Sequence, residues 1–236
     1  MQIEVISNVN EAQAERFSHR TAIVIDVLRA TSTIVAALSA GAAGIVPVET
    51  VLEARALLCE GQVLAGERFC RKIPGFDLGN SPEEFSAEAV RGRRVVLTTT
   101  NGTRALHKAM RADHVLAGSL NNAAACARAA MELRRDLVLL CAGSHDEFAL
   151  EDGVCAGLII SELQAMCGVP LEMNDFGQGM LGLYRNTADK LYELISGSVT
   201  GKRLIKYGSG RDVERCSQVN CSSIVPRMQG DMLVQG

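Results

Sequence analysis

Short apolar runs alternate with longer amphipathic stretches along the first 142 residues of the chain. The apolar runs are rich in β-branched residues, which favour extended backbone in a buried sheet. They predict strands over residues 2–6, 22–28, 44–48, 62–66, 94–100, 114–118 and 136–142. Runs such as VVLTT and LVLLCA are apolar at successive positions, so both faces of the predicted sheet should be covered.

The stretches between these runs are rich in Ala and Leu, and several end in Gly or in basic residues, as helices commonly do. They predict helices over residues 31–41, 51–61, 103–110 and 123–135. Strands that alternate with helices pack as a parallel sheet between two helical layers. The predicted fold is therefore an α/β three-layer sandwich with a mostly parallel central sheet.

After residue 142 this alternation fades, and helical patterns dominate. They predict helices over residues 149–167, 187–196, 200–207 and 211–218, and one further strand in the tail at IVPRM. No Pro/Gly-rich linker or internal repeat divides the chain, so residues 1–236 are predicted to form a single domain with a helical C-terminal part from about residue 149.

One long stretch, RFCRKIPGFDLGNSPEE (68–84), has neither a strand nor a helix pattern. It carries Pro, Gly, Asn and Ser, which favour turns. Loops of this length inside compact domains usually have a function or move. The stretch is therefore predicted to form a lid.

The overall charge excludes some classes of partner. The formal net charge is -3, the isoelectric point is about 5.9, and no block of basic residues compensates locally, so nucleic-acid binding is not expected. Apolar segments such as 153–163 are far shorter than the roughly 20 residues of a membrane span, and the N-terminus does not resemble a signal peptide. A cytoplasmic protein without a membrane partner is expected, and the apolar C-terminal helices leave room for a homodimer.

The cysteines and histidines do not suggest a zinc site. The chain has 8 Cys but no Cys-x-x-Cys pair, which favours buried, reduced thiols over a metal site. Its 4 His include no His-x-x-x-His or His-Glu-x-x-His spacing. Any metal site should therefore use oxygen ligands.

Ionisable and hydroxyl-bearing residues follow several predicted strands directly. The carboxyl ends of parallel strands meet at one edge of a sheet, where ligands bind. The residues predicted at this edge are Asp26, Arg29, Thr31, Ser32 and Thr33, then Glu67 and Arg68, then Thr98 to Arg104, and finally Gly143 to Glu147 with Glu151 and Asp152.

Two hydroxyl-rich turns, LRATST and TTTNGTR, each lead into a predicted helix. The free N–H groups of a helix start suit a phosphate, so Thr31, Ser32, Asn101, Gly102 and Thr103 are candidates for phosphate binding. An exposed helix terminus contributes only about 0.3–1 kcal/mol per charge, which is too little to hold a dianion alone. A cation should therefore assist.

Four acids are the candidate ligands for that cation: Asp26, Glu67, Glu147 and Asp152. Carboxylate oxygens suit Mg²⁺, which also keeps water and substrate oxygens as ligands. Asp26 carries the strongest indication, because an acid after an apolar strand is costly to bury without a partner. Of the neighbours Glu151 and Asp152, Asp152 is favoured as a ligand only by a small margin, because Glu151 could serve as an acid of the helix start.

Simpler explanations exist for individual residues. Thr31 or Ser32 alone could be a helix cap, Asn101 with Gly102 could be only a turn, and Arg104 could face solvent. His145 could form a structural hydrogen bond or contact the substrate. Cys141 fits the core better than the role of nucleophile.

Four strings, VIDVLRATSTI, GERFCRKIPGFDLGNSP, LTTTNGTRAL and CAGSHDEFALEDGVCAG, resemble in this order the 2-phosphosulfolactate phosphatase family. The resemblance covers about residues 20–225. It implies a three-layer α/β/α sandwich with a mixed sheet, and Mg²⁺-dependent hydrolysis of 2-phosphosulfolactate to sulfolactate, a step toward coenzyme M in organisms that make it.

The same resemblance places thirteen residues in or near the site. They are Asp26, Arg29, Thr31, Ser32, Glu67, Arg68, Asn80, Ser81, Asn101, Gly102, Thr103, Glu147 and Asp152. One departure is visible, because Phe69, Cys70 and Arg71 stand where the family tends toward glycine. These bulkier residues could narrow the pocket and change the substrate.

The resulting hypothesis is in-line attack of water on a phosphate monoester. Asp26 and Glu147 would hold Mg²⁺, Asp26 would orient or deprotonate the water, and Arg29 and Arg68 would offset the charge of the transition state. A covalent aspartyl intermediate lacks support, because no second Asp stands two residues after Asp26. Two alternatives stay open: phosphatase action on another 2-phosphorylated hydroxy acid such as phospholactate, and non-catalytic binding of small anionic metabolites.

Overall fold

All seven predicted strands are present in the computed structural model, which describes residues 1–168 and 171–236. They are β1 (Gln2–Ile6), β2 (Arg20–Ile25), β3 (Gly44–Val48), β4 (Val63–Arg68), β6 (Arg94–Thr98), β7 (His114–Gly118) and β8 (Asp136–Cys141). β2 and β6 end earlier than predicted, at Ile25 and Thr98. The polar residues that follow leave the sheet and turn into helix starts.

The strands form one mixed sheet in the order β5-β4-β6-β3-β11-β10-β7-β2-β8-β1-β9. Four short strands complete it: β5 (Arg71–Lys72), β9 (Glu172–Met173), β10 (Pro226–Gln229) and β11 (Met232–Gln235). The β10/β11 hairpin is antiparallel and joins two parallel halves, through Arg227 opposite Leu116 and Leu233 opposite Ile45. The tail therefore returns two strands to the sheet, where the sequence pattern predicted one.

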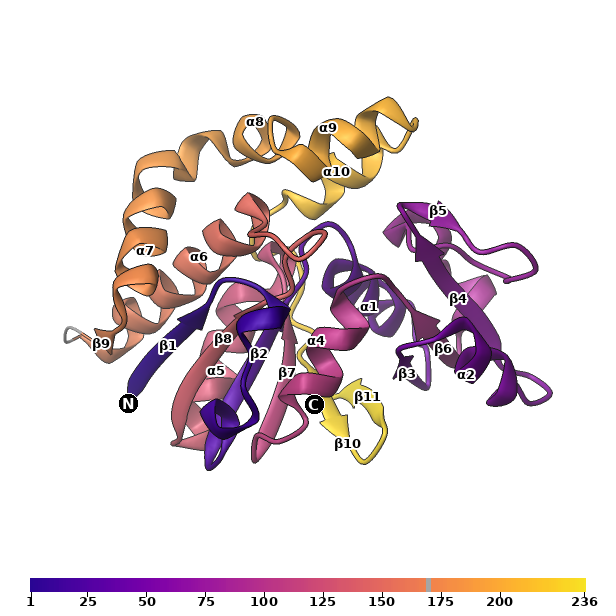
Figure 1. The fold of residues 1–236 in the computed structure, drawn as a ribbon, viewed down its shortest axis with the longest axis horizontal. Helices are drawn as coiled ribbons and strands as arrows, with labels where there is room; N and C mark the ends of the chain where they lie inside the picture. The colour runs from indigo at the N-terminus through magenta and orange to yellow at the C-terminus, as the bar shows by residue number, and fades with distance from the viewer. Residues whose placement is uncertain (169–170) are drawn as a thin grey trace.

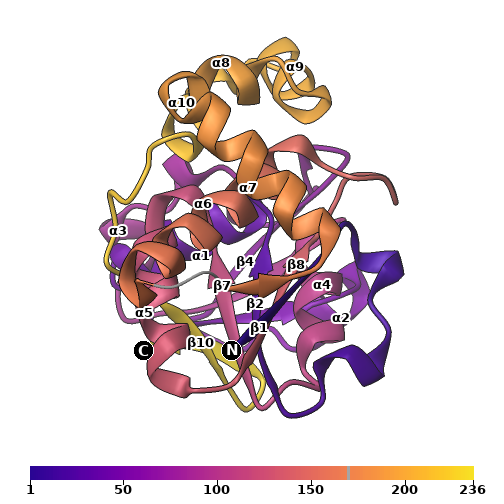
Figure 2. The same ribbon diagram turned by 90° about the vertical axis from the view of Figure 1, so that its left-hand side faces the viewer.

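Helices cover both faces of this sheet, as the apolar strands predicted. The helices between strands are α1 (Ala30–Ser39), α2 (Val51–Ala56), α3 (Ala87–Val90), α4 (Gly102–Ala109) and α5 (Ala123–Leu133). Along β2, Ile23 and Ile25 pack into a cluster with α5, whereas Ala22 and Val24 pack into another with α1 and α4. Figure 2 shows α5 on one side of the central strands and α4 on the other.

The C-terminal part is helical from residue 150. It contains α6 (Leu150–Cys167), α7 (Asp175–Thr187), α8 (Leu191–Ser196), α9 (Val199–Lys206) and α10 (Gly210–Cys216). Figure 1 shows α8, α9 and α10 above the carboxyl ends of the central strands. These three helices therefore form a roof over the edge of the sheet where the sequence predicts a site.

α7 was not predicted, and the helix predicted over 187–196 begins later, at α8. The sequence of α7, DFGQGMLGLYRNT, contains three glycines, which weaken any helix pattern. Close packing against α6 holds it instead. A Cβ at Gly157 of α6 would lie 2.1 Å from the carbonyl oxygen of Met180 in α7, so glycine lets the two backbones touch.

In the described part of the chain, no helix combines the length and the apolar character that crossing a membrane requires. All eight cysteines are free thiols, as their spacing predicted, and four of them are buried: Cys126, Cys141, Cys155 and Cys216.

Candidate active site

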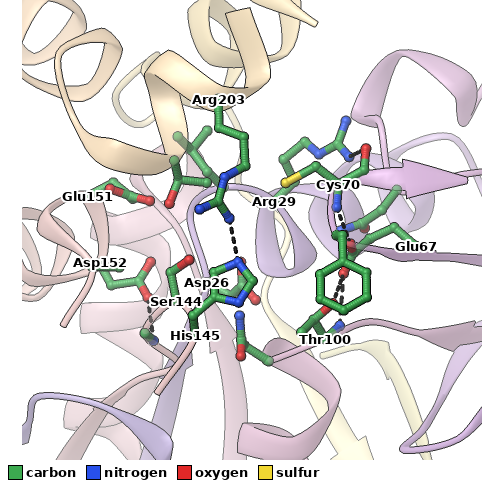
Figure 3. Close-up of a pocket in the computed structure, with 17 residues that line it drawn as sticks. Asp26, Arg29, Glu67, Cys70, Thr100, Ser144, His145, Glu151, Asp152 and Arg203 are labelled. Atoms are coloured by element: carbon green, nitrogen blue, oxygen red, sulfur yellow. Dashed lines mark hydrogen bonds between the residues drawn. The ribbon is translucent and has the colours of Figure 1, made fainter. Parts of the chain in front are cut away.

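A small cavity of about 40 Å³ lies at the carboxyl edge of the sheet, beneath the roof helices (Figure 3). Six of the predicted site residues line it: Asp26, Arg29, Glu67, Asn80, Asn101 and Asp152. Cavities need at least about 10–15 Å³ for each water, so this one admits only a few water-sized groups. A larger ligand requires its walls to move outward.

Asp26 lies at the centre of this arrangement, directly after β2. Its Oδ1 accepts a hydrogen bond from the N–H of Ala30 at the start of α1, over 3.1 Å. Gly102, at the start of α4, lies against its other oxygen, since a Cβ there would be 2.5 Å from Oδ2. The predicted proximity of the two helix starts to Asp26 is therefore present, and Gly102 is required by close contact.

Three further carboxylates face the same cavity. Asp152 accepts hydrogen bonds from the N–H groups of Val27 (2.8 Å) and Gly143 (3.0 Å). Glu67 accepts from the N–H and hydroxyl of Thr100 through Oε1, at 2.8 and 2.9 Å, and from the N–H of Cys70 through Oε2, at 2.7 Å.

Glu151 is the fourth carboxylate. It is only 2% exposed, yet its oxygens have no hydrogen-bond donor among residues 1–168 and 171–236. A buried carboxylate without a donor is costly, so a bound cation would stabilise this group. The sequence offered two neighbouring acids here, and acids at a helix start are common, which is why Asp152 was preferred.

Burial and repulsion by neighbouring charges raise the pKa values of two of these acids, Asp26 and Asp152. Burial, together with the charges of Glu67 and Glu151, raises the pKa of Asp26 from 3.8 to about 7, against the opposing hydrogen bond from Ala30. Burial and the charges of Asp26 and Glu151 raise the pKa of Asp152 well above its usual range. A bound cation would remove this cost.

The donor set fits Mg²⁺ in chemistry, although no group of three or more His, Cys, Asp or Glu in the described residues is close enough to enclose an ion. Mg²⁺ commonly takes one or two carboxylates and completes its shell with water and substrate oxygens. The free oxygens of Asp26 and Glu151 could supply these ligands. The carboxylates of Asp152 and Glu67 line the same cavity and would add negative charge beside the ion.

Arg29 brings positive charge to the cavity. Its Nη1 donates to Oδ2 of Asp212 at 2.5 Å, and both side chains are buried. Asp212, from α10, also accepts a hydrogen bond from the hydroxyl of Ser81 at 2.6 Å. Asp212 was not predicted as a site residue. Its carboxylate connects the roof to the turn after β2 and to the 68–84 segment.

Arg68 and Ser81 do not line the cavity. The guanidinium of Arg68 donates to the carbonyls of Glu67 and Glu49 and to the hydroxyl of Thr98, at 2.8 to 2.9 Å. This arginine therefore stabilises the end of β4, and it lies near the cavity without lining it.

Thr31, Ser32 and Thr103 are also outside the cavity. Their hydroxyls bond to nearby backbone, with Thr31 donating to the carbonyl of Asp26 at 2.8 Å, Ser32 to that of Val27 at 2.8 Å and Thr103 to that of Thr99 at 3.1 Å. The helix cap considered for Thr31 or Ser32 is therefore wrong, because both lie inside α1, whose N-cap is Arg29. They shape the turn that holds Asp26.

Glu147, predicted as a metal ligand, lies on an exposed turn. Its backbone pairs with that of Ser144, and its side chain borders a larger neighbouring pocket of about 650 Å³ instead of the cavity. The turn carries Glu147 away from the sheet edge. Glu151, four residues further on, lines the cavity where Glu147 was predicted.

The 68–84 segment contributes two points to the cavity wall, Phe69 with Cys70 and then Asn80. Phe69 and Cys70 have φ values of 55° and 65°, in the left-handed region that favours glycine. The ring of Phe69 stacks on His145, with centroids 6.1 Å apart. The Oδ1 of Asn80 is buried without a hydrogen-bond partner in the described structure.

Thr200 and Arg203 also line the cavity, and both come from α9 in the roof. Sequence reasoning did not predict them, because GSVTGKR (197–203) lacks the Gly-x-x-x-x-Gly-Lys-Ser/Thr spacing of a phosphate-binding loop. Their one signal is their i, i+3 spacing, which places both on one face of a helix.

Comparisons with known proteins identify the family. The family model described as 2-phosphosulpholactate phosphatase matches residues 6–231. A probable 2-phosphosulfolactate phosphatase of Symbiobacterium thermophilum is 42% identical over 222 residues, covering 92% of this chain and 95% of that protein. Others so named, from Thermotoga petrophila and Clostridium tetani, are 39% and 34% identical, covering 91% and 99% of this chain and 92% and 100% of theirs. The chain belongs to the 2-phosphosulpholactate phosphatase family of phosphoric monoester hydrolases.

Proposed function

We propose that this protein is a Mg²⁺-dependent phosphatase that hydrolyses 2-phosphosulfolactate to sulfolactate and phosphate. The observation that carries the proposal is the convergence of four buried carboxylates and Arg29 on one cavity, in a chain of this family. Such a density of buried negative charge is unfavourable without a cation, and a divalent ion would make it suitable for a phosphate ester.

Asp26 and Glu151 are the proposed ligands of Mg²⁺, with Asp152 and Glu67 beside them. When bound, the ion supplies positive charge to the phosphoryl oxygens. Glu151 replaces Glu147 in this assignment, because Glu151 faces the cavity and Glu147 does not.

The proton of the attacking water would pass to a carboxylate of the cavity. Asp26 is the best placed, since it lines the cavity directly after β2 and its Oδ2 receives no hydrogen bond from the described residues. The guanidinium of Arg29, held by Asp212, would offset charge that develops on the phosphoryl group. The amide oxygen of Asn80, buried without a donor among the described residues, would accept a hydrogen bond from the attacking water.

The test is phosphate release from 2-phosphosulfolactate, 2-phospholactate and 4-nitrophenyl phosphate, each with Mg²⁺ and with excess chelator. We expect the first to be the best substrate and chelator to abolish its turnover. Preference for 2-phospholactate would assign the enzyme to another 2-phosphorylated acid. Tight binding of these compounds with chelator present, and no phosphate release, would instead identify a non-catalytic binder.

A further inference from the structure

Three arginines lie near the cavity, and they differ in how their charge is balanced. Arg29 is paired with the buried carboxylate of Asp212, and Arg68 is fully engaged by backbone carbonyls and Thr98. Arg203 has no carboxylate partner within the described ranges. Its hydrogen bond is to the ring nitrogen Nε2 of His145, which can accept while the ring is neutral. Arg203 therefore holds a positive charge available to a ligand.

Thr200 lies one turn before Arg203 on the same face of α9. Its side chain is 5% exposed, and its hydroxyl has no hydrogen-bond partner among the residues that the structure describes. Thr200 and Arg203 both border the cavity and also the larger pocket beside it. Figure 3 shows Arg203 reaching down from the roof into the space between Glu151 and Cys70.

The charges of the cavity constrain how a substrate can lie. A phosphorylated 2-hydroxy acid carries a carboxylate or a sulfonate beside its phosphate, and such a group is repelled by the acids at the floor. A phosphate can lie there because a divalent ion bridges it to the carboxylates. A second acid group has no such bridge, so it should face the cation on the opposite wall.

We propose that Arg203 and Thr200 form the subsite for the acid group of the substrate that does not carry the phosphate. This inference rests on the proposed function and names the part of the site that selects the substrate class. A guanidinium grips two oxygens of a carboxylate or sulfonate at once, and the hydroxyl of Thr200 would donate to the same group. The subsite comes from α9, so the roof selects the substrate and the sheet edge supplies the chemistry.

The variant R203Q tests the subsite, and K202Q is its matched control. Both remove one positive charge from α9, but Lys202 is exposed and lines neither pocket. The readout is the ratio of kcat/KM for 2-phosphosulfolactate to kcat/KM for 4-nitrophenyl phosphate, which has no second acid group. We expect R203Q to lower this ratio about tenfold to a hundredfold, mainly through KM, as loss of a charged hydrogen bond predicts. K202Q should leave it within about twofold.

A purely structural role would give another pattern. Suppose that Arg203 only anchored the turn that bears His145. H145A should then lower the ratio of the two kcat/KM values as much as R203Q does. Alternatively, R203Q should lower kcat/KM for both substrates by the same factor. Either finding would overturn the subsite.

Binding of sulfolactate, followed by calorimetry without turnover, separates this inference from the proposed function. Wild type should bind sulfolactate with Mg²⁺, and R203Q should bind it at least about tenfold more weakly. Such a difference in a protein that releases no phosphate would support the subsite and contradict the proposed activity. If the protein releases phosphate and R203Q binds sulfolactate as tightly as wild type, the proposed activity is supported and the subsite is contradicted.

Discussion

Asp26 lies at the end of β2, and its carboxylate receives one backbone hydrogen bond. Burial, together with the charges of two other acids, raises its pKa to about 7. The sequence predicted an acid of this kind because it follows an apolar strand directly. What it could not supply was the environment, since the neighbours that set the pKa come from β4 and α6.

For Asp26→Asn we expect a loss of phosphatase activity of at least about a hundredfold, because the variant removes the proposed base and a metal ligand. The free energy of unfolding at pH 8 should not fall, since the substitution keeps the shape and removes a repelled charge. Phosphate release and urea denaturation measure the two quantities. Activity close to that of wild type would remove Asp26 from the mechanism.

Gly102→Ala should be destabilising. Its Cβ would lie 2.4 Å from that of Ala30 and 2.5 Å from Oδ2 of Asp26, so we expect a loss of about 1–3 kcal/mol and of most activity. Gly179→Ala is the matched control, because this exposed helical glycine has open space around it and should gain up to about 1 kcal/mol. Urea midpoints that move alike in the two variants would contradict the close contact.

The sequence predicted which acids at strand ends reach the cavity better than it predicted which hydroxyl groups do. Asp26, Glu67 and Asp152 reach the cavity, whereas the hydroxyls of Thr31 and Ser32 bond to carbonyls of the preceding turn. A hydroxyl beside a helix start looks the same in sequence whether it binds backbone or substrate. The conformation of the turn determines whether the hydroxyl faces the backbone or the substrate.

At the scale of elements, α10 joins the site through a single side chain. Asp212 pairs with Arg29 of the β2–α1 turn and with Ser81 of the 68–84 segment. The sequence predicted α10 as a helix but gave no reason to connect it with Arg29, more than 180 residues earlier.

Asp212→Ala should cost about 3–5 kcal/mol in the free energy of unfolding, since it leaves the guanidinium of Arg29 buried without its partner. Ser81→Ala removes only one hydrogen bond from the same carboxylate and should cost about 0.5–1.5 kcal/mol. Denaturant titration compares the two variants. Equal losses would mean that the ion pair adds nothing beyond the hydrogen bond.

Predicted and observed elements differ most where packing overrides local preference. α7 forms despite its three glycines because it packs closely on α6. Phe69 and Cys70 adopt left-handed backbone although neither is glycine. Both features depend on contacts with distant residues, so the local sequence pattern did not indicate them.

At the scale of the whole molecule, two parallel half-sheets and a helical roof enclose a cavity lined by four carboxylates. The layers and the sheet were predictable from the alternation of apolar runs. The β10/β11 hairpin between the halves was only half predicted, because each of its strands has four residues and pairs with the flanking parallel strand at one position.

The acids should make the metal-free protein less stable as pH rises. The pKa of Asp26 is 3.8 ordinarily and about 7 in the fold, so between these values the folded state keeps a proton that the unfolded state has lost. The free energy of unfolding should therefore decrease from pH 4 to 7, by up to about 4 kcal/mol from this group. Urea titrations of wild type and Asp26→Asn should show the steeper decrease in wild type.

Mg²⁺ should counteract this decrease, because it binds ionised carboxylates in the folded state. Saturating Mg²⁺ should raise the urea midpoint more at pH 8 than at pH 5. An equal rise at both values, or none, would argue against an ion among these acids.

A crystal structure with Mn²⁺ in place of Mg²⁺ and with phosphate tests the central claim most directly, because the anomalous signal locates the metal. The account predicts one ion in the cavity bounded by Asp26, Glu67, Glu151 and Asp152, with a phosphate oxygen beside it. An ion bound elsewhere, in protein that releases phosphate in the presence of Mn²⁺, would contradict it.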